Sequence, residues 1–150
     1  MPPPNVPKAT FNQILKNIPK PQLSAEGTLR FSFKYAQIPG SKPFSIAERD
    51  ADYFIKVLER LVNLSGMKTS DFVGKKERSI RNHSVNWNDN RVSQKGFTCL
   101  NEATREQADP AAFQFSVSKV EHGRVVGFLI GDTFFFVWCD PDHALYPYQE

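Results

Sequence analysis

The sequence predicts an α+β domain: an N-terminal strand and a pair of helices, then a three-stranded antiparallel meander, with the helices packed on one face of the sheet. Three observations predict this class. Apolar and polar residues alternate over residues 28–35, apolar residues recur at helical spacing over residues 45–64, and short alternating segments separated by turn residues follow residue 112. Helices that cluster in sequence before a meander are typical of such a sandwich.

Length and composition indicate one folded domain with an aromatic core. The chain has 150 residues, of which 40% are hydrophobic and 13% aromatic. A chain of this size buries enough apolar surface to fold without a disulfide or a metal. Six of the eleven prolines fall within residues 1–26. We therefore divide the chain into a proline-rich extension, residues 1–26, and a single α+β domain, residues 27–150.

The extension contains one apolar stripe. Its members recur at helical spacing and are Phe11, Ile14, Leu15 and Ile18. This spacing places them on one side of a short helix over residues 10–17, which Thr10 caps. The stripe either docks on the domain or binds a partner. We favour docking, because an apolar stripe usually packs on its own core.

The next elements are a strand and two helices. Residues 28–35, TLRFSFKY, alternate as a half-buried strand does. Residues 45–64 carry the strongest helical pattern, and we expect Ser45 and Glu48 to form a capping box at its start. A second helix is predicted to begin near residue 69 or 70 and to continue into a basic cluster.

The final third predicts the meander. Polar residues alternate with Phe113, Phe115 and Val117, the next strand covers residues 124–130, and Gly131 with Asp132 forms a tight hairpin turn. Residues 133–139 are almost continuously apolar, which is typical of a central strand buried on both faces.

Several classes of protein are disfavoured by the sequence. No apolar run approaches the ~18 residues that cross a membrane, so we expect a cytoplasmic protein with no membrane partner. The two cysteines, Cys99 and Cys139, suit a reducing compartment. The alternative is a single disulfide between them. The chain has no P-loop, G-x-G-x-x-G, G-x-S-x-G or paired C-x-x-C motif, so we expect no cofactor.

Charge gathers in one stretch of the chain, whose net charge is only +3. The members of this basic cluster are Lys75, Lys76, Arg78, Arg81 and His83. Two interpretations remain open: a solvated surface or a set of nucleic-acid phosphate contacts. A long polar loop, residues 82–96, follows. Its Trp87 either anchors in the core or stacks on a base.

The meander ends in Asp140-Pro141-Asp142-His143, with Tyr146 close behind. A histidine titrates near neutrality, so His143 is a candidate general acid or base. The alternative is a plain turn in which Asp140 or Asp142 accepts backbone amides. A divalent cation held by these residues would need a further ligand, such as Glu121 or His122, and the spacing matches no known metal motif.

The segment HGRVVGFLIGDTFFFVWCDPDHALY, together with the order of the elements, resembles the RelE/ParE superfamily of small bacterial toxins. In its ribonuclease members mRNA is cut without a metal. The resemblance implies that Arg124 steadies the scissile phosphate and that His143 and Tyr146 transfer protons. It also implies that the basic cluster holds RNA or the ribosome, and that a cognate antitoxin or another protein is a partner.

Two hypotheses about function follow. In the first, the protein is a toxin-like or related defence protein that acts on RNA as a metal-independent endoribonuclease. In the second, it is a non-catalytic binding module of phage defence or counter-defence that holds a protein or a nucleic acid. The enzyme requires Arg124, His143 and Tyr146 to converge on one phosphate position. For Arg124, a simple cross-strand ion pair with Glu121 or Asp132 is the structural alternative.

Overall fold

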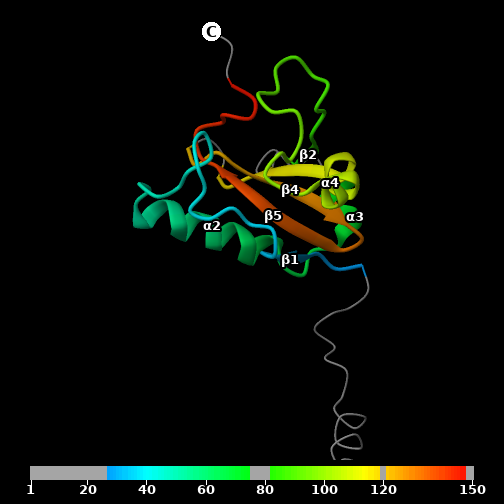
Figure 1. The fold of residues 1–150 in the computed structure, drawn as a ribbon. Helices are drawn as coiled ribbons and strands as arrows, with labels where there is room; N and C mark the ends of the chain where they lie inside the picture. Colours follow the sequence, from blue (N-terminus) through cyan, green and yellow to red (C-terminus); the bar gives the residue numbers. More distant parts are fainter. Residues whose placement is uncertain (1–26, 75–81, 119–120, 148–150) are drawn as a thin grey trace, which may run out of the picture.

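The computed structural model describes residues 27–74, 82–118 and 121–147. Within these ranges the chain forms one mixed five-stranded sheet and three α-helices (Figure 1). The strands are β1 (Arg30–Ser32), β2 (His83–Ser84), β3 (Ala112–Ser116), β4 (Arg124–Ile130) and β5 (Thr133–Asp140), in the spatial order β1-β5-β4-β3-β2. The α+β class is therefore confirmed.

The sheet is larger than the predicted three-stranded meander. Strands β3, β4 and β5 pair antiparallel in sequence order, but β1 adds to the free side of β5 in parallel and β2 adds to β3 antiparallel. Both added strands are short, at three and two residues. Residues 28–35 thus contribute a much shorter strand than their alternation predicts.

Strand β5 is central, as its apolar composition predicts. It lies between β1 and β4. The β4–β5 hairpin closes at Gly131 and Asp132, where Gly131 has φ 60° and Ile130 pairs with Thr133. Asp132 also anchors the start of the domain, because its backbone oxygen accepts from Arg30 N at 2.8 Å and its carboxylate accepts from Gly27 N at 3.0 Å.

A β-bulge sets the face of the sheet to which each side chain at the end of β5 points. Val126 pairs with Trp138 while the next residue, Gly127, pairs with Phe136, so Val137 is the extra residue. Side chains alternate along a strand, and one extra residue reverses the alternation. A Cβ on Gly127 would lie 2.0 Å from the Phe135 oxygen, so only glycine fits there.

Each face of the sheet has its own core. The first core includes Phe72, Phe113, Phe115, Phe134 and Phe136. The second includes Phe97, Ala112, Val126, Phe128 and Trp138. Neighbours along each strand belong to different cores, as expected for opposite faces. The bulge places Trp138 in the second core.

Helix α2 (Ala51–Leu64) covers the first face, yet it begins six residues later than predicted. Its N-cap is Asp50, whose carboxylate accepts from Tyr53 N at 3.1 Å, so the predicted capping box is wrong. The reason is tertiary: Ile46 is buried in the first core and its amide donates to Pro39 O at 2.9 Å. This contact keeps the preceding residues in a loop.

Two shorter helices complete the fold. Helix α3 (Thr69–Gly74) adds Phe72 to the first core. Helix α4 (Glu102–Ala108) was not predicted; Asn101 caps it, and Ala108 packs in the second core. The helices therefore lie on both faces, not on one. Figure 1 shows α2 on one side of the sheet and the loop after β2 on the other.

Candidate functional site

Four polar residues from separate parts of the chain meet on the second face, near the edge formed by β2. We call them the His83 cluster: His83, Gln114, Arg124 and Tyr146. They come from β2, β3, the first residue of β4 and the tail after β5. His83 is paired with Gln114, and Arg124 is paired with Ser116, two residues further along β3 on the same face.

Arg124 and His83 form the central contact of the cluster. The Nη1 atom of Arg124 lies 2.6 Å from Nε2 of His83. The other ring nitrogen, Nδ1, is 3.0 Å from the backbone oxygen of Ser84. A carbonyl oxygen only accepts and a guanidinium only donates. These contacts therefore require a neutral imidazole with its proton on Nδ1 and the lone pair of Nε2 facing Arg124.

Gln114 supports the ring from beneath. Its side chain has no exposed surface, and its amide nitrogen lies 3.2 Å from both ring nitrogens of His83. Because an amide nitrogen only donates, only the contact to the unprotonated Nε2 is a hydrogen bond in this tautomer. The amide oxygen makes no hydrogen bond to any described residue. A buried acceptor without a partner is uncommon and costs about 1–3 kcal/mol. The alternation of β3 suggests that this side chain is exposed, so the sequence does not reveal its role.

Tyr146 is the fourth member. Its ring centroid lies 6.0 Å from that of His83, in an edge-to-face arrangement. Its hydroxyl oxygen accepts from Asn86 N at 3.3 Å, and the ring packs against the second core. Leu145 is fully buried and holds the tail against the domain. The hydroxyl is therefore positioned by the burial of the preceding residue and by the bond from Asn86 N.

The turn after β5 is built around Asp140, which is 1% exposed. Its two carboxylate oxygens accept from Ala144 N at 2.7 Å and from Leu145 N at 2.9 Å. Burial raises the pKa of Asp140, while the two amide hydrogen bonds and the nearby His143 lower it. The turn interpretation of this motif is thus supported for Asp140, since its oxygens are used by the backbone.

His143 closes the same turn. Its backbone has φ 56°, a left-handed conformation that is uncommon for residues other than glycine, and its amide is 3.5 Å from the Asp140 oxygen. The contacts to Arg124, Gln114 and Tyr146 described above are made by His83. The histidine that the structure places beside Arg124 and Tyr146 is therefore the one that the sequence assigned to nucleic-acid binding.

Asp142 lies at the surface, where its carboxylate pairs with Arg49 at 2.5 Å. The two residues border an open depression of about 520 Å³ that is also lined by Lys42 and Glu48. Two cations and two acids line this depression, so it is close to electrically balanced. Balanced charge makes it a poorer site for a phosphate than the His83 cluster.

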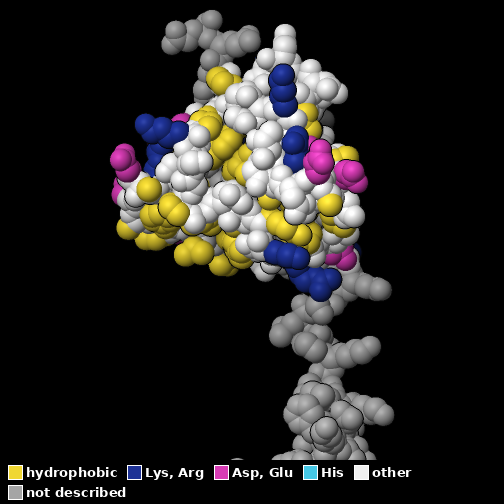
Figure 2. Space-filling model, in the orientation of Figure 1, with side chains coloured by type: hydrophobic (Ala, Val, Ile, Leu, Met, Phe, Trp, Pro, Cys, Tyr) yellow, Lys and Arg dark blue, Asp and Glu magenta, His cyan; other side chains and the backbone are white. Residues whose placement is uncertain are grey.

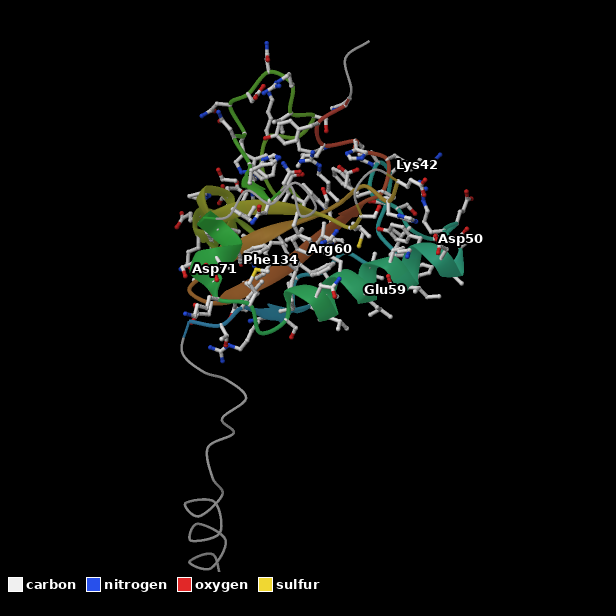
Figure 3. The ribbon with its side chains drawn as sticks, turned by 180° about the vertical axis from the view of Figure 1, so that it is seen from behind. Lys42, Asp50, Glu59, Arg60, Asp71 and Phe134 are labelled. Atoms are coloured by element: carbon white, nitrogen blue, oxygen red, sulfur yellow. The ribbon has the colours of Figure 1, made fainter. Side chains whose placement is uncertain are left out.

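A second histidine network fastens α2 to the β3–β4 connection. His122 Nε2 lies 3.0 Å from a carboxylate oxygen of Asp52, and its Nδ1 lies 2.9 Å from Ser118 Oγ. Arg60 reaches from α2 to the sheet, where its Nε donates to Val117 O at 3.1 Å (Figure 3). These contacts lie on the α2 side, away from the His83 cluster.

The remaining sequence-predicted residues fall into two groups. Lys75, Lys76, Arg78 and Arg81 lie outside the described residues. Trp87 is anchored: its Nε1 donates to Asp109 O at 2.8 Å and its ring lies 5.1 Å from that of Phe97. Arg124 contacts His83 through its Nη1 atom.

The described residues give no support to a metal site, a reactive thiol or a membrane-spanning helix. No three His, Cys, Asp or Glu side chains there form a group suited to a metal ion. Cys99 and Cys139 are both free thiols, and burial raises the pKa of each. No helix among the described residues has the length and apolar character needed to cross a bilayer.

Comparison of the chain with protein-family models, curated proteins and solved structures finds no match.

Proposed function

We propose that this protein binds RNA at the His83 cluster and cleaves it there as a metal-independent endoribonuclease. The observation that carries the proposal is the contact between Arg124 Nη1 and His83 Nε2 at 2.6 Å, with Tyr146 beside the same ring. A cation, a neutral imidazole and a phenol are the groups that phosphodiester cleavage by acid–base chemistry requires.

Arg124 is suited to hold the scissile phosphate. A guanidinium makes stronger, charge-assisted hydrogen bonds to a phosphate than to a neutral imidazole. RNA is therefore expected to draw Arg124 from His83 toward the phosphate. That movement leaves the lone pair of His83 Nε2 open to a proton donor, so binding of the substrate prepares the base.

His83 and Tyr146 then divide the proton transfers. His83 Nε2 takes the proton of the 2′-hydroxyl, whose oxygen forms a bond to the adjacent phosphorus. The bond from phosphorus to the 5′-oxygen breaks, and that oxygen receives the proton of Tyr146. Arg124 stabilises the negative charge that develops on the phosphate oxygens. The products are a 2′,3′-cyclic phosphate and a 5′-hydroxyl end.

Two further features support the proposal. Four basic residues, Lys75, Lys76, Arg78 and Arg81, shortly precede β2 in the chain, and cations near a phosphate site add affinity through counterion release. The resemblance to RelE/ParE toxins implies the same type of reaction, with His143 as the transferring histidine. The proposal keeps Arg124 and Tyr146 in their implied roles and assigns the base to His83.

The test uses the full chain and a short end-labelled RNA in the presence of EDTA. We expect cleavage that leaves 2′,3′-cyclic phosphate ends and that fails on the 2′-O-methyl version of the same RNA. His83→Gln and Tyr146→Phe should each lower the rate by about 10²–10⁴. Arg124→Lys should lower it by about 10²–10³, because one lysine cannot replace the fork of donors.

His143→Gln is the matched histidine variant in this assay. If His143→Gln cleaves RNA at the wild-type rate and His83→Gln does not, the general base is His83. The opposite pattern restores His143 to the role that the resemblance implies. Circular dichroism spectra and thermal unfolding of each variant separate lost chemistry from lost folding.

The second candidate is a non-catalytic module that holds a nucleic acid or a protein. The observation that favours it is the contact between Arg124 and His83. Cleavage requires this contact to break so that His83 can accept a proton, whereas binding of a partner does not. If the wild type binds RNA without cutting it, and Arg124→Lys weakens that binding, the non-catalytic module is the correct interpretation.

A further inference from the structure

Helix α2 carries an apolar surface that its own domain does not cover. The side facing the sheet holds Tyr53, Val57, Leu61 and Leu64, which pack in the first core. Beside it lies a second apolar set, the α2 outer stripe, whose exposed fractions are 41% for Phe54, 51% for Ile55, 62% for Leu58 and 74% for Val62. Figure 2 shows hydrophobic side chains gathered over this helix.

The outer stripe is too large for an ordinary surface helix. Each residue turns a helix by about 100°, so the two sets together cover an arc of roughly 200°. A helix that packs on one face of a domain typically has an apolar arc of ~100°. Contiguous exposed apolar surface of this kind usually marks a contact with another segment or molecule.

The chain itself supplies a segment at the right place. Leu29 N donates to Met67 O at 2.8 Å, and Thr69 N donates to Gly27 O at 2.7 Å. The domain therefore begins beside the C-terminal end of α2. Residues 19–26 can extend over about 26 Å, whereas α2 is only about 21 Å long. Any point on the outer stripe lies within reach of the preceding segment.

That segment carries the complementary pattern. Its apolar residues, at helical spacing, are Phe11, Ile14, Leu15 and Ile18, and residues 1–26 contain three lysines and one acid, Glu26. The polar side of α2 is electrically balanced: it carries two acids and two bases, Glu59 pairs with Lys56, and Asp52 pairs with His122. The match between the two segments is therefore apolar: two apolar stripes of similar length suit helix–helix packing.

We propose that residues 10–18 form an amphipathic helix that docks on the α2 outer stripe of the same molecule. The occupant is this segment rather than a foreign partner, because its tether ends next to the stripe and keeps its local concentration high. The stripe lies on the opposite face from the His83 cluster. The inference is thus independent of the proposed ribonuclease activity.

The test measures the accessibility of one thiol on the stripe of the full chain. Cys99→Ser removes the exposed native thiol, and Leu58→Cys places a reporter on the stripe. We expect a maleimide to modify the reporter thiol of Leu58→Cys at least about tenfold more slowly than a fully exposed thiol. This factor of about ten corresponds to a docked segment that leaves the stripe less than a tenth of the time. Ile14→Asp should restore fast modification.

Gln13→Asp is the matched control, since it adds the same charge off the stripe of residues 10–18. It should leave the reporter protected. Fast modification in the unaltered extension, or protection that Ile14→Asp does not relieve, would overturn the proposal. Protection that grows with protein concentration would overturn it in favour of a second copy. Thermal unfolding of each variant shows that the domain itself stays folded.

Discussion

Arg124 and His83, which are 41 residues apart in the chain, place a guanidinium nitrogen 2.6 Å from an imidazole nitrogen on the second face of the sheet. The contact depends on the pairing of three strands. It joins the first residue of β4 to the edge strand β2, with β3 between them.

The first prediction concerns the protonation of His83. With Nδ1 bonded to the Ser84 oxygen and Nε2 facing Arg124, nitrogen NMR at mildly alkaline pH should show a single tautomer protonated at Nδ1. Arg124→Leu should shift the Nε2 signal. Arg49→Leu, which removes a different arginine, should leave it unchanged. A signal from protonated Nε2 in the wild type would contradict the assignment.

The second prediction concerns Gln114, whose buried amide oxygen has no described partner. Gln114→Met keeps an unbranched side chain and removes the polar group. We expect the free energy of unfolding to rise by about 1 kcal/mol, because the unpaired oxygen is lost. RNA affinity should fall, since His83 loses its support. Gln107→Met on the exposed side of α4 should change stability by less than about 0.5 kcal/mol. A clear loss of stability in Gln114→Met would show that the amide is satisfied.

The third prediction concerns Asp140, which binds two backbone amides. Asp140→Asn should lower the free energy of unfolding by about 1–3 kcal/mol, because one amide loses its acceptor. Asp142→Asn, on the exposed carboxylate paired with Arg49, should cost no more than about 1 kcal/mol. Denaturant titrations of the three proteins provide the comparison.

The same carboxyl group gives the stability a pH dependence. Burial raises the pKa of Asp140 in the folded state above its unfolded value of ~3.9. The folded state therefore binds more protons between these two values, and the contribution of this group to stability falls as the pH rises through that window. The stability difference between wild type and Asp140→Asn should fall with pH there. A difference that rises with pH would show that the amide bonds outweigh burial.

The fourth prediction concerns the start of α2. Asp50→Ala should lower the free energy of unfolding by about 1 kcal/mol, because Tyr53 N loses its cap. Ser45→Ala should change it by less than about 0.5 kcal/mol, since the exposed Ser45 hydroxyl accepts from Ala47 N within the loop and caps no helix among the described residues. Equal losses in the two variants would restore the capping box that the sequence predicts.

The sequence by itself determined the elements whose cues are local. Alternation and turn chemistry located β3, β4, β5 and the Gly131–Asp132 hairpin, and a continuous apolar run identified β5 as central. The helical spacing of apolar residues over 54–62 located α2 but not its start. Local cues favoured Ser45 as the cap, whereas burial of Ile46 and its bond to Pro39 outweighed them. Helix α4 had a cue, Asn101 before several helix-forming residues, that the prediction overlooked.

Only the tertiary structure decided how the candidate site is assembled. Strand β2 is two residues long and has no recognisable pattern, yet its pairing with β3 brings His83 to Arg124. Gln114 is buried beside the same strand, where His83 pairs with it. The Val137 bulge sets which face the end of β5 presents. These outcomes depend on register and long-range pairing, whose free energy comes from contacts between distant residues that no local pattern encodes.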